Sequence, residues 1–115
     1  MKKINLRVGR EEINGKSTFF TTYDILKMAI NYPEERGFNV EEMAYRLKLL
    51  EKIEKYKDKF FIKENEFTED KLLLEDVLEL EDSEFEKLKK LFASLKWTVL
   101  SKFVVDLDKE LKKTN

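Results

Sequence analysis

Cysteine and histidine are absent from this chain of 115 residues, which contains only three glycines and one proline. The lack of cysteine excludes disulfides and thiolate nucleophiles, and the lack of histidine removes the commonest catalytic base and zinc ligand. The glycines, Gly9, Gly15 and Gly37, are too far apart to form a loop that cradles a phosphate. These absences predict a protein that is not an enzyme and that binds no metal and no cofactor.

Long apolar stretches are also missing. No run approaches the roughly 20 apolar residues that a helix needs to span a bilayer. The N-terminal residues MKKINLRVGRE contain no apolar segment of signal-peptide length. We therefore expect no membrane association and a cytoplasmic location, in a reducing compartment that suits a chain without cysteine.

Apolar and charged residues dominate what is present. Hydrophobic residues make up 42% of the chain and charged residues 41%, so the chain can bury a core beneath a heavily charged surface. Its length is typical of one domain. We predict a single domain over residues 1–115, with a β-strand or hairpin in residues 1–21 and mainly helical structure in residues 22–115.

The N-terminal pattern is that of a hairpin followed by helices. Residues 3–8 alternate in polarity, so three side chains share one face: Ile4, Leu6 and Val8. Asn14-Gly15 favours a turn because both residues tolerate positive φ, and a strand is expected to return over 18–21. A helix over 23–31 is apolar around nearly its whole circumference and should lie centrally. It ends before Pro33.

A longer helix is expected from Val40 to about residue 57. Asn39 is its predicted N-cap, with Glu42 at the third helical position. The helix has two apolar stripes, which predict two neighbours. One stripe consists of Val40, Met43, Ala44, Leu47 and Leu50, and the other of Leu49, Ile53 and Tyr56.

The second half of the chain is less regular. Residues 60–62 and 72–80 are short apolar runs that could pair as a second hairpin, although 71–80 could equally form a helix. Ser83 and Glu86 have capping-box spacing and open a helix with a regular apolar stripe: Phe85, Leu88, Leu91, Phe92 and Leu95. Residues 97–99 predict a break before a last helix. The predicted class is α+β, mainly α, with three to five helices and a short β segment in the middle.

Charge is segregated along the chain although its net charge is only −1. Residues 64–86 contain eleven acidic side chains and one basic side chain, a charge of −10 that leaves +9 for the rest. Three interpretations stay open. The acidic block neutralises basic residues within the molecule or across a dimer, the basic 46–63 segment follows a nucleic-acid backbone, or the acidic block mimics such a backbone for a basic partner.

The candidate contact residues come from the acidic block and from apolar residues near the C-terminus. Carboxylates are dense at four positions, without calcium-loop spacing: Glu75, Asp76, Glu79 and Glu81. Apolar residues over 97–105, including Trp97 and Phe103, point in more directions than one buried face accommodates. We predict that these six residues bind a protein partner or a second copy. The alternative for the apolar ones is that packing within the domain buries them.

Residues 40–53 read Val-Glu-Glu-Met-Ala-Tyr-Arg-Leu-Lys-Leu-Leu-Glu-Lys-Ile. Residues 78–85 read Leu-Glu-Leu-Glu-Asp-Ser-Glu-Phe and precede an amphipathic helix and a Trp. In this pattern residues 39–107 resemble small, mainly helical accessory proteins of phages and prophages. The resemblance implies a role in virion assembly, as an oligomeric head, neck or tail component or a chaperone, and it transfers no functional residue.

The sequence thus predicts a non-catalytic protein-interaction or assembly module of phage type, which acts as a homo-oligomer in the cytoplasm or on the virion. The second prediction is a nucleic-acid-binding or regulatory protein that uses the basic 46–63 segment.

Overall fold

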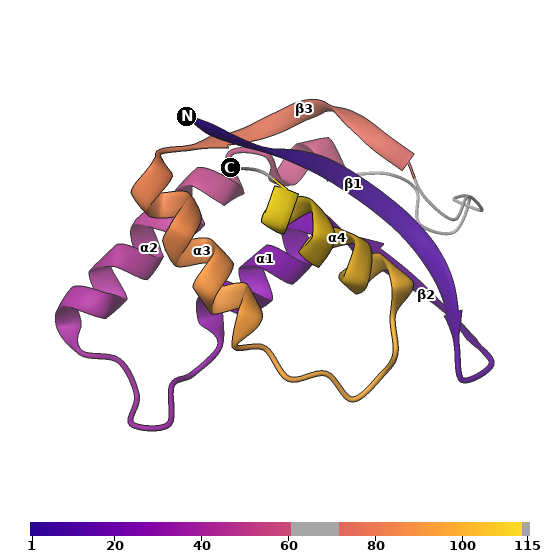
Figure 1. Ribbon diagram of the computed structural model, residues 1–115, viewed down its shortest axis with the longest axis horizontal. Helices are drawn as coiled ribbons and strands as arrows, with labels where there is room; N and C mark the ends of the chain where they lie inside the picture. The colour runs from indigo at the N-terminus through magenta and orange to yellow at the C-terminus, as the bar shows by residue number, and fades with distance from the viewer. Residues whose placement is uncertain (61–71, 114–115) are drawn as a thin grey trace.

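The computed structural model describes residues 1–60 and 72–113. These residues form a three-stranded antiparallel sheet with the order β2-β1-β3 and four α-helices. The strands are β1 (Lys2–Ile13), β2 (Lys16–Thr21) and β3 (Leu72–Leu80), and the helices are α1 (Thr22–Asn31), α2 (Val40–Glu54), α3 (Asp82–Ala93) and α4 (Lys102–Lys113), with a 3-10 helix η1 (Lys57–Phe60). The curved sheet forms one layer and the helices lie along one side of it (Figure 1). The predicted mainly helical α+β class is confirmed.

The N-terminal hairpin forms as its sequence predicts. Asn14 and Gly15 are the two loop residues, with φ of 53° and 79°, between the paired residues Ile13 and Lys16. Two consecutive positive φ angles match the right-handed twist of a hairpin, and Asn-Gly supplies them at low cost. The apolar face of β1 is buried over Ile4, Leu6 and Val8.

β3 pairs with β1, which makes β1 the central strand. Ile4 lies opposite Leu78 and both are buried, while Lys3 lies opposite the exposed Glu79. This ladder decides between the two possibilities for 71–80, because residues 72–80 form a strand. The predicted pairing with residues 60–62 falls partly outside the described residues, and Phe60 belongs to η1. Local patterns do not reveal a partner that lies about 75 residues away in the chain.

α1 occupies the centre of the molecule. The hydroxyl of Thr21 accepts the backbone N–H of Asp24 at 3.0 Å and caps the helix. Ile25, Leu26 and Ile30 are among its buried residues, and the helix contacts α2, α3, β1 and β2. The predicted central position of this helix is confirmed.

α3 starts earlier than its predicted capping box. Its N-cap is Glu81, and Oε1 of Glu84 accepts the Glu81 N–H at 3.0 Å, so the prediction for Ser83 and Glu86 was wrong. Glu84 takes this role because burial beside Lys52 turns its carboxylate inward. The apolar stripe from Phe85 to Leu95 is buried. The predicted break is confirmed, since α3 ends at Ala93 and α4 begins at Lys102.

Candidate protein-interaction surface

A buried arginine fixes the orientation of α2. Arg46 is 5% exposed, and its Nη1 donates to the carbonyl oxygens of Ile30 at 3.0 Å and Tyr32 at 2.8 Å. Its Nε donates to Glu42 at 2.9 Å and its Nη2 to Glu34 at 3.0 Å. A carbonyl in the last turn of a helix lacks an intrahelical donor, so Arg46 caps α1 from the side of α2.

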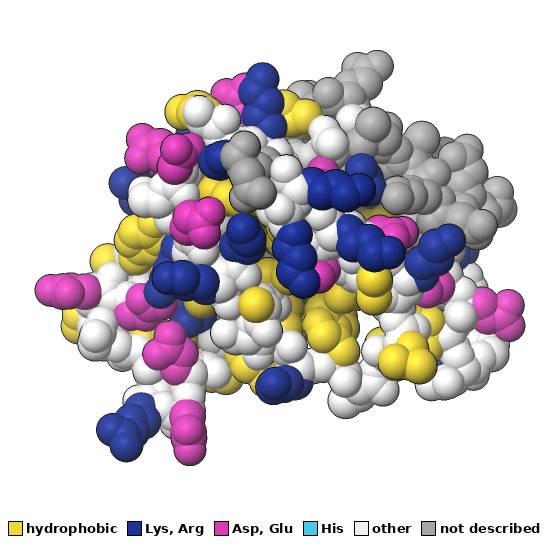
Figure 2. All heavy atoms as spheres, in the orientation of Figure 1, with side chains coloured by type: hydrophobic (Ala, Val, Ile, Leu, Met, Phe, Trp, Pro, Cys, Tyr) yellow, Lys and Arg dark blue, Asp and Glu magenta, His cyan; other side chains and the backbone are white. Residues whose placement is uncertain are grey.

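Because Arg46, Leu49 and Ile53 point inward, the other apolar stripe of α2 points outward. Val40 is 79% exposed, Leu47 58% and Met43 46%. With the exposed Ala44 they form a surface that we call the α2 face, defined as Val40, Met43, Ala44 and Leu47. Figure 2 shows hydrophobic side chains at the surface along the margin that α2 occupies in Figure 1. The described chain supplies two neighbours of α2, namely α1 and α3, and still leaves Val40, Met43 and Leu47 exposed.

A small hollow borders the α2 face. Its volume is about 70 Å³, and its apolar lining includes Phe38, Met43, Leu47 and Leu50. The ring of Phe38 also lies 4.3 Å from the guanidinium of Arg46, which fixes one wall of the hollow. Single exposed apolar side chains are ordinary on protein surfaces, but a continuous stripe with an adjoining apolar hollow is typical of a contact surface.

The predicted acidic contact residues lie around β3 and the start of α3. Glu79 is exposed and its carboxylate lies 3.8 Å from Lys3 Nζ, and Glu81 is the exposed N-cap of α3. The side chains of Glu75 and Asp76 lie outside the described residues. Where the structure describes them, the acidic residues of this group are surface groups beside basic neighbours or a helix end.

The predicted apolar contact residues are mostly packed into the domain. Phe103 is buried and its ring stacks on Phe20 with centroids 5.6 Å apart, and Trp97 is half-buried against the core. Val105 is 50% exposed and Leu100 95%. Glu81 precedes α3 and Trp97 follows it, so the acidic and aromatic candidates lie at opposite ends of a helix about 18 Å long.

Two ion pairs connect α2 to α3. Lys52 Nζ lies 2.5 Å from Oε1 of Glu84, and Lys87 Nζ lies 2.7 Å from Oε1 of Glu42. Burial acts to raise the pKa of Glu84, but the hydrogen bonds from Lys52 and the Glu81 N–H outweigh it and lower that pKa. The hydrogen bonds from Lys87 and Arg46 lower the pKa of Glu42. The Lys52–Glu84 pair joins the basic 46–63 segment to the acidic block and so supports the interpretation that the two neutralise each other within the molecule.

The same contacts change the case for nucleic-acid binding. Arg46 and Lys52 belong to the basic 46–63 segment, and both are engaged by carboxylates of the same molecule. A second basic region lies elsewhere, because residues 87–113 contain eight lysines and three acidic residues. Dark blue side chains gather over α3 and α4 in Figure 2. This lysine excess is present in the sequence, but the division into an acidic block and a basic 46–63 segment does not reveal it.

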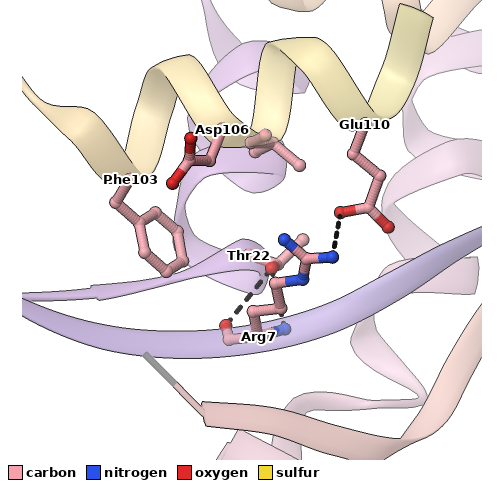
Figure 3. A pocket seen from close by; sticks show the side chains of 6 residues that line it. Arg7, Thr22, Phe103, Asp106 and Glu110 are labelled. Atoms are coloured by element: carbon pink, nitrogen blue, oxygen red, sulfur yellow. Dashed lines mark hydrogen bonds and ion pairs between the residues drawn. The ribbon is translucent and has the colours of Figure 1, made fainter. Parts of the chain in front are cut away.

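A buried polar contact joins α4 to β1, shown in Figure 3. Thr22 follows the last residue of β2, and its hydroxyl accepts the Arg7 N–H at 2.9 Å and donates to the Arg7 carbonyl oxygen at 3.2 Å. The β1–β2 ladder ends at the pair Val8 and Thr21, so the Thr22 hydroxyl takes the place of the next strand residue as hydrogen-bond partner of Arg7. Glu110 of α4 accepts the Asn5 N–H at 2.9 Å and lies 3.4 Å from Arg7 Nη2. The cavity between these groups measures only about 10 Å³, so this contact is a structural joint with room for little more than a water.

The chain was compared with protein-family models, with curated proteins and with solved structures, and none of the three comparisons gave a match. Among the described residues, no three acidic side chains gather as a metal ion would require. In the same residues, no helix combines the length and the apolar character needed to cross a membrane.

Proposed function

We propose that the protein is a non-catalytic interaction module that works as a homo-oligomer, with the α2 face as its contact surface. The observation that carries the proposal is the exposure of Val40, Met43 and Leu47 in one continuous stripe. Full burial of an exposed Val, Leu or Met side chain contributes about 1.5–3 kcal/mol, and these partly exposed side chains would gain a fraction of that from a second copy.

The architecture around the stripe supports this proposal. Arg46 and its four acceptors hold α2 in one orientation, so the stripe is presented on a rigid element. A preorganised surface loses little conformational entropy on association. Within this function, the resemblance of residues 39–107 to phage accessory proteins suggests a component or chaperone of virion assembly, located in the cytoplasm or on the virion.

Sedimentation equilibrium from about 10 µM to about 1 mM tests self-association. We expect the average mass to rise with concentration, and we expect Val40→Glu to hold the chain at the monomer mass over this range. Val105→Glu is the matched control, because Val105 is an exposed valine on α4 away from the α2 face. Wild-type protein that stays monomeric at the highest concentration would contradict the homo-oligomer.

Nucleic-acid binding through α3 and α4 is a second candidate function. It is favoured by the lysine excess of residues 87–113 and by the gathering of basic side chains over these helices in Figure 2. Lysines that contact phosphates release condensed counterions, so binding through them weakens steeply as salt rises.

Fluorescence anisotropy with a labelled DNA duplex and a salt titration tests the second candidate. Binding through this surface predicts that Lys109→Gln and Lys113→Gln, both at exposed positions, weaken binding and reduce the slope of log affinity against log salt by about one for each lysine. Lys55→Gln is the control, because Lys55 is an exposed lysine at the end of α2. If only Lys55→Gln weakens binding, the nucleic-acid site lies in the 46–63 segment and not on α3 and α4.

A further inference from the structure

We infer that α2 pairs in the antiparallel direction with α2 of a second copy, about a two-fold axis that passes between Met43 and Ala44. This inference rests on the proposed self-association and specifies its geometry. Val40 then faces Leu47 of the second copy, and Met43 and Ala44 of the two copies form the central layer of the contact. A two-fold contact requires this reciprocity, because any residue that meets a second one is met by it in return.

The spacing of the α2 face carries the first step. Its four positions follow the helical pattern i, i+3, i+4 and i+7, and they are exposed on one side of α2. Reversing the chain direction maps Val40 onto Leu47 and Met43 onto Ala44. The set is thus symmetric about its own centre. Met43 and Ala44 lie on opposite edges of the stripe, so each lies beside its own equivalent in the second copy.

The charges beside the α2 face carry the second step. Glu41 and Lys48 are exposed and lie seven residues apart along one edge of the stripe. In an antiparallel pair related by a two-fold axis, each edge faces the same edge of its partner. Glu41 therefore lies on the same side as Lys48 of the second copy and about 3 Å from it along the axis, within reach of an ion pair, and the contact occurs twice.

The opposite edge explains why the direction is antiparallel. The hollow lined by Phe38, Met43 and Leu50 borders the stripe on that side. Antiparallel pairing sets this apolar edge against its equivalent, whereas parallel pairing would set it against the charged edge with Glu41 and Lys48. Antiparallel helices also place the positive end of each macrodipole beside the negative end of the other.

The size of the α2 face sets the expected strength of the contact. The stripe covers seven helical steps, or about 10 Å of helix axis. A contact of this length falls at the low end of known interface sizes. The edge with Glu41 and Lys48 determines the alignment of the two helices more than it strengthens their binding. We therefore expect a reversible dimer with a dissociation constant on the order of 100 µM.

Charge reversal with rescue tests the register. Glu41→Lys and Lys48→Glu should each raise the dimer dissociation constant about three- to tenfold, because each change creates two repulsive contacts. The double variant should restore the constant to within about twofold of the wild type. Glu86→Lys, at an exposed position on α3, makes the same change in net charge as Glu41→Lys and should leave the dissociation constant unchanged.

Two results would overturn the inferred pairing while leaving self-association in place: a dimer whose strength ignores both single reversals, or single reversals that the double variant fails to rescue. A chain that is monomeric throughout would instead remove the proposed homo-oligomer itself. The two failures are therefore distinct in the same sedimentation experiment.

Engineered cysteines test the direction, since the natural sequence contains none that would interfere. A mixture of Val40→Cys and Leu47→Cys proteins should oxidise to the mixed disulfide faster than either protein alone forms its own. In the inferred pair positions 40 and 47 face each other, whereas equal positions lie about 10 Å apart along the axis, beyond disulfide reach. Faster disulfide formation by either protein alone would overturn the antiparallel arrangement.

Discussion

α2 and α4 are surface helices of similar length that use their apolar residues in opposite ways. α4 buries Phe103, Val104, Leu107 and Leu111 on one face, and Val105 is its exposed large apolar residue. α2 buries Leu49 and Ile53 but leaves the α2 face in solvent. An apolar excess in a sequence segment therefore does not by itself locate a contact surface, because the arrangement around the helix decides whether the domain covers it.

The two helices also differ in how they are held. Asn39, the residue before α2, accepts the Glu42 N–H at 2.7 Å, so the cap of α2 is local. The first N–H groups of α4, on Lys102 and Phe103, donate to Glu11 of β1 at 2.6 and 3.4 Å. Ser101 donates to the same carboxylate at 2.8 Å and accepts the Val104 N–H at 3.2 Å. α4 is thus capped by a residue 91 positions earlier in the chain.

The largest expected effect is a difference in stability between variants on the buried face of α4 and variants on the α2 face. Phe103→Ala should lower the free energy of unfolding by about 3–4 kcal/mol, because it removes the ring stacked on Phe20 and leaves a cavity. Leu47→Ala should change it by less than about 0.5 kcal/mol, since Leu47 is exposed. Urea denaturation at a low protein concentration measures both. Equal losses in the two variants would contradict the contrast between these helices.

The next effect concerns the arginine that orients α2. Arg46→Met should lower the free energy of unfolding by about 2–4 kcal/mol, because Glu42 and the carbonyl groups of Ile30 and Tyr32 lose their charged donor. Lys48→Met is the control on the exposed side of the same helix and should stay within about 0.5 kcal/mol. The measurement is again the urea midpoint. If Arg46→Met leaves the free energy of unfolding unchanged, packing alone positions α2.

The smallest expected effect compares the two caps through their pH dependence. Burial acts to raise the pKa of Glu11, but hydrogen bonds from Lys102, Ser101 and Phe103 bring it below its ordinary value of 4.5. The folded state therefore binds this proton more weakly than the unfolded state. The stabilisation is complete above about pH 4.5 and is lost as the pH falls through the folded-state pKa.

Glu11→Gln should therefore cost about 1 kcal/mol at pH 7 and much less at about pH 3.5. Asn39→Ala should cost about 1 kcal/mol at both pH values, because the Asn39 side chain does not titrate. Thermal or urea unfolding at the two pH values gives these differences. If the cost of Glu11→Gln does not change with pH, the negative charge at α4 contributes nothing.

Features with local signals were predictable from the sequence. Asn14-Gly15 predicted the hairpin, Asn39 predicted the start of α2, and residues 97–99 predicted the break before α4. Each depends on residues within a few positions of one another. The capping box of α3 was assigned wrongly because the partner that fixes Glu84, Lys52 of α2, lies 32 residues away.

The candidate surface was only half predictable. Helical spacing revealed both stripes of α2, but it could not tell which would face the core, because Arg46 decides that through the carbonyl groups at the end of α1. Phe103 counted as surplus because its partner Phe20 lies in β2, far from α4 in the sequence. Contacts between distant segments determine exposure, and one-dimensional spacing does not contain them.

The capping of α4 by Glu11 has a consequence for the order of folding. A helix of 12 residues is marginal by itself in water. α4 therefore gains its stability when β1 supplies the Glu11 carboxylate and the backbone N–H of Asn5. The hairpin, with contacts close in sequence, can form early, whereas α4 closes the longest loop. On the β2 side of the sheet, β2 pairs with β1 only from Val8 onward, so the backbone N–H of Asn5 has no strand partner there. During synthesis this N–H lacks its acceptor until Glu110 leaves the ribosome. That interval is the time at which this strand is most open to pairing with the wrong chain.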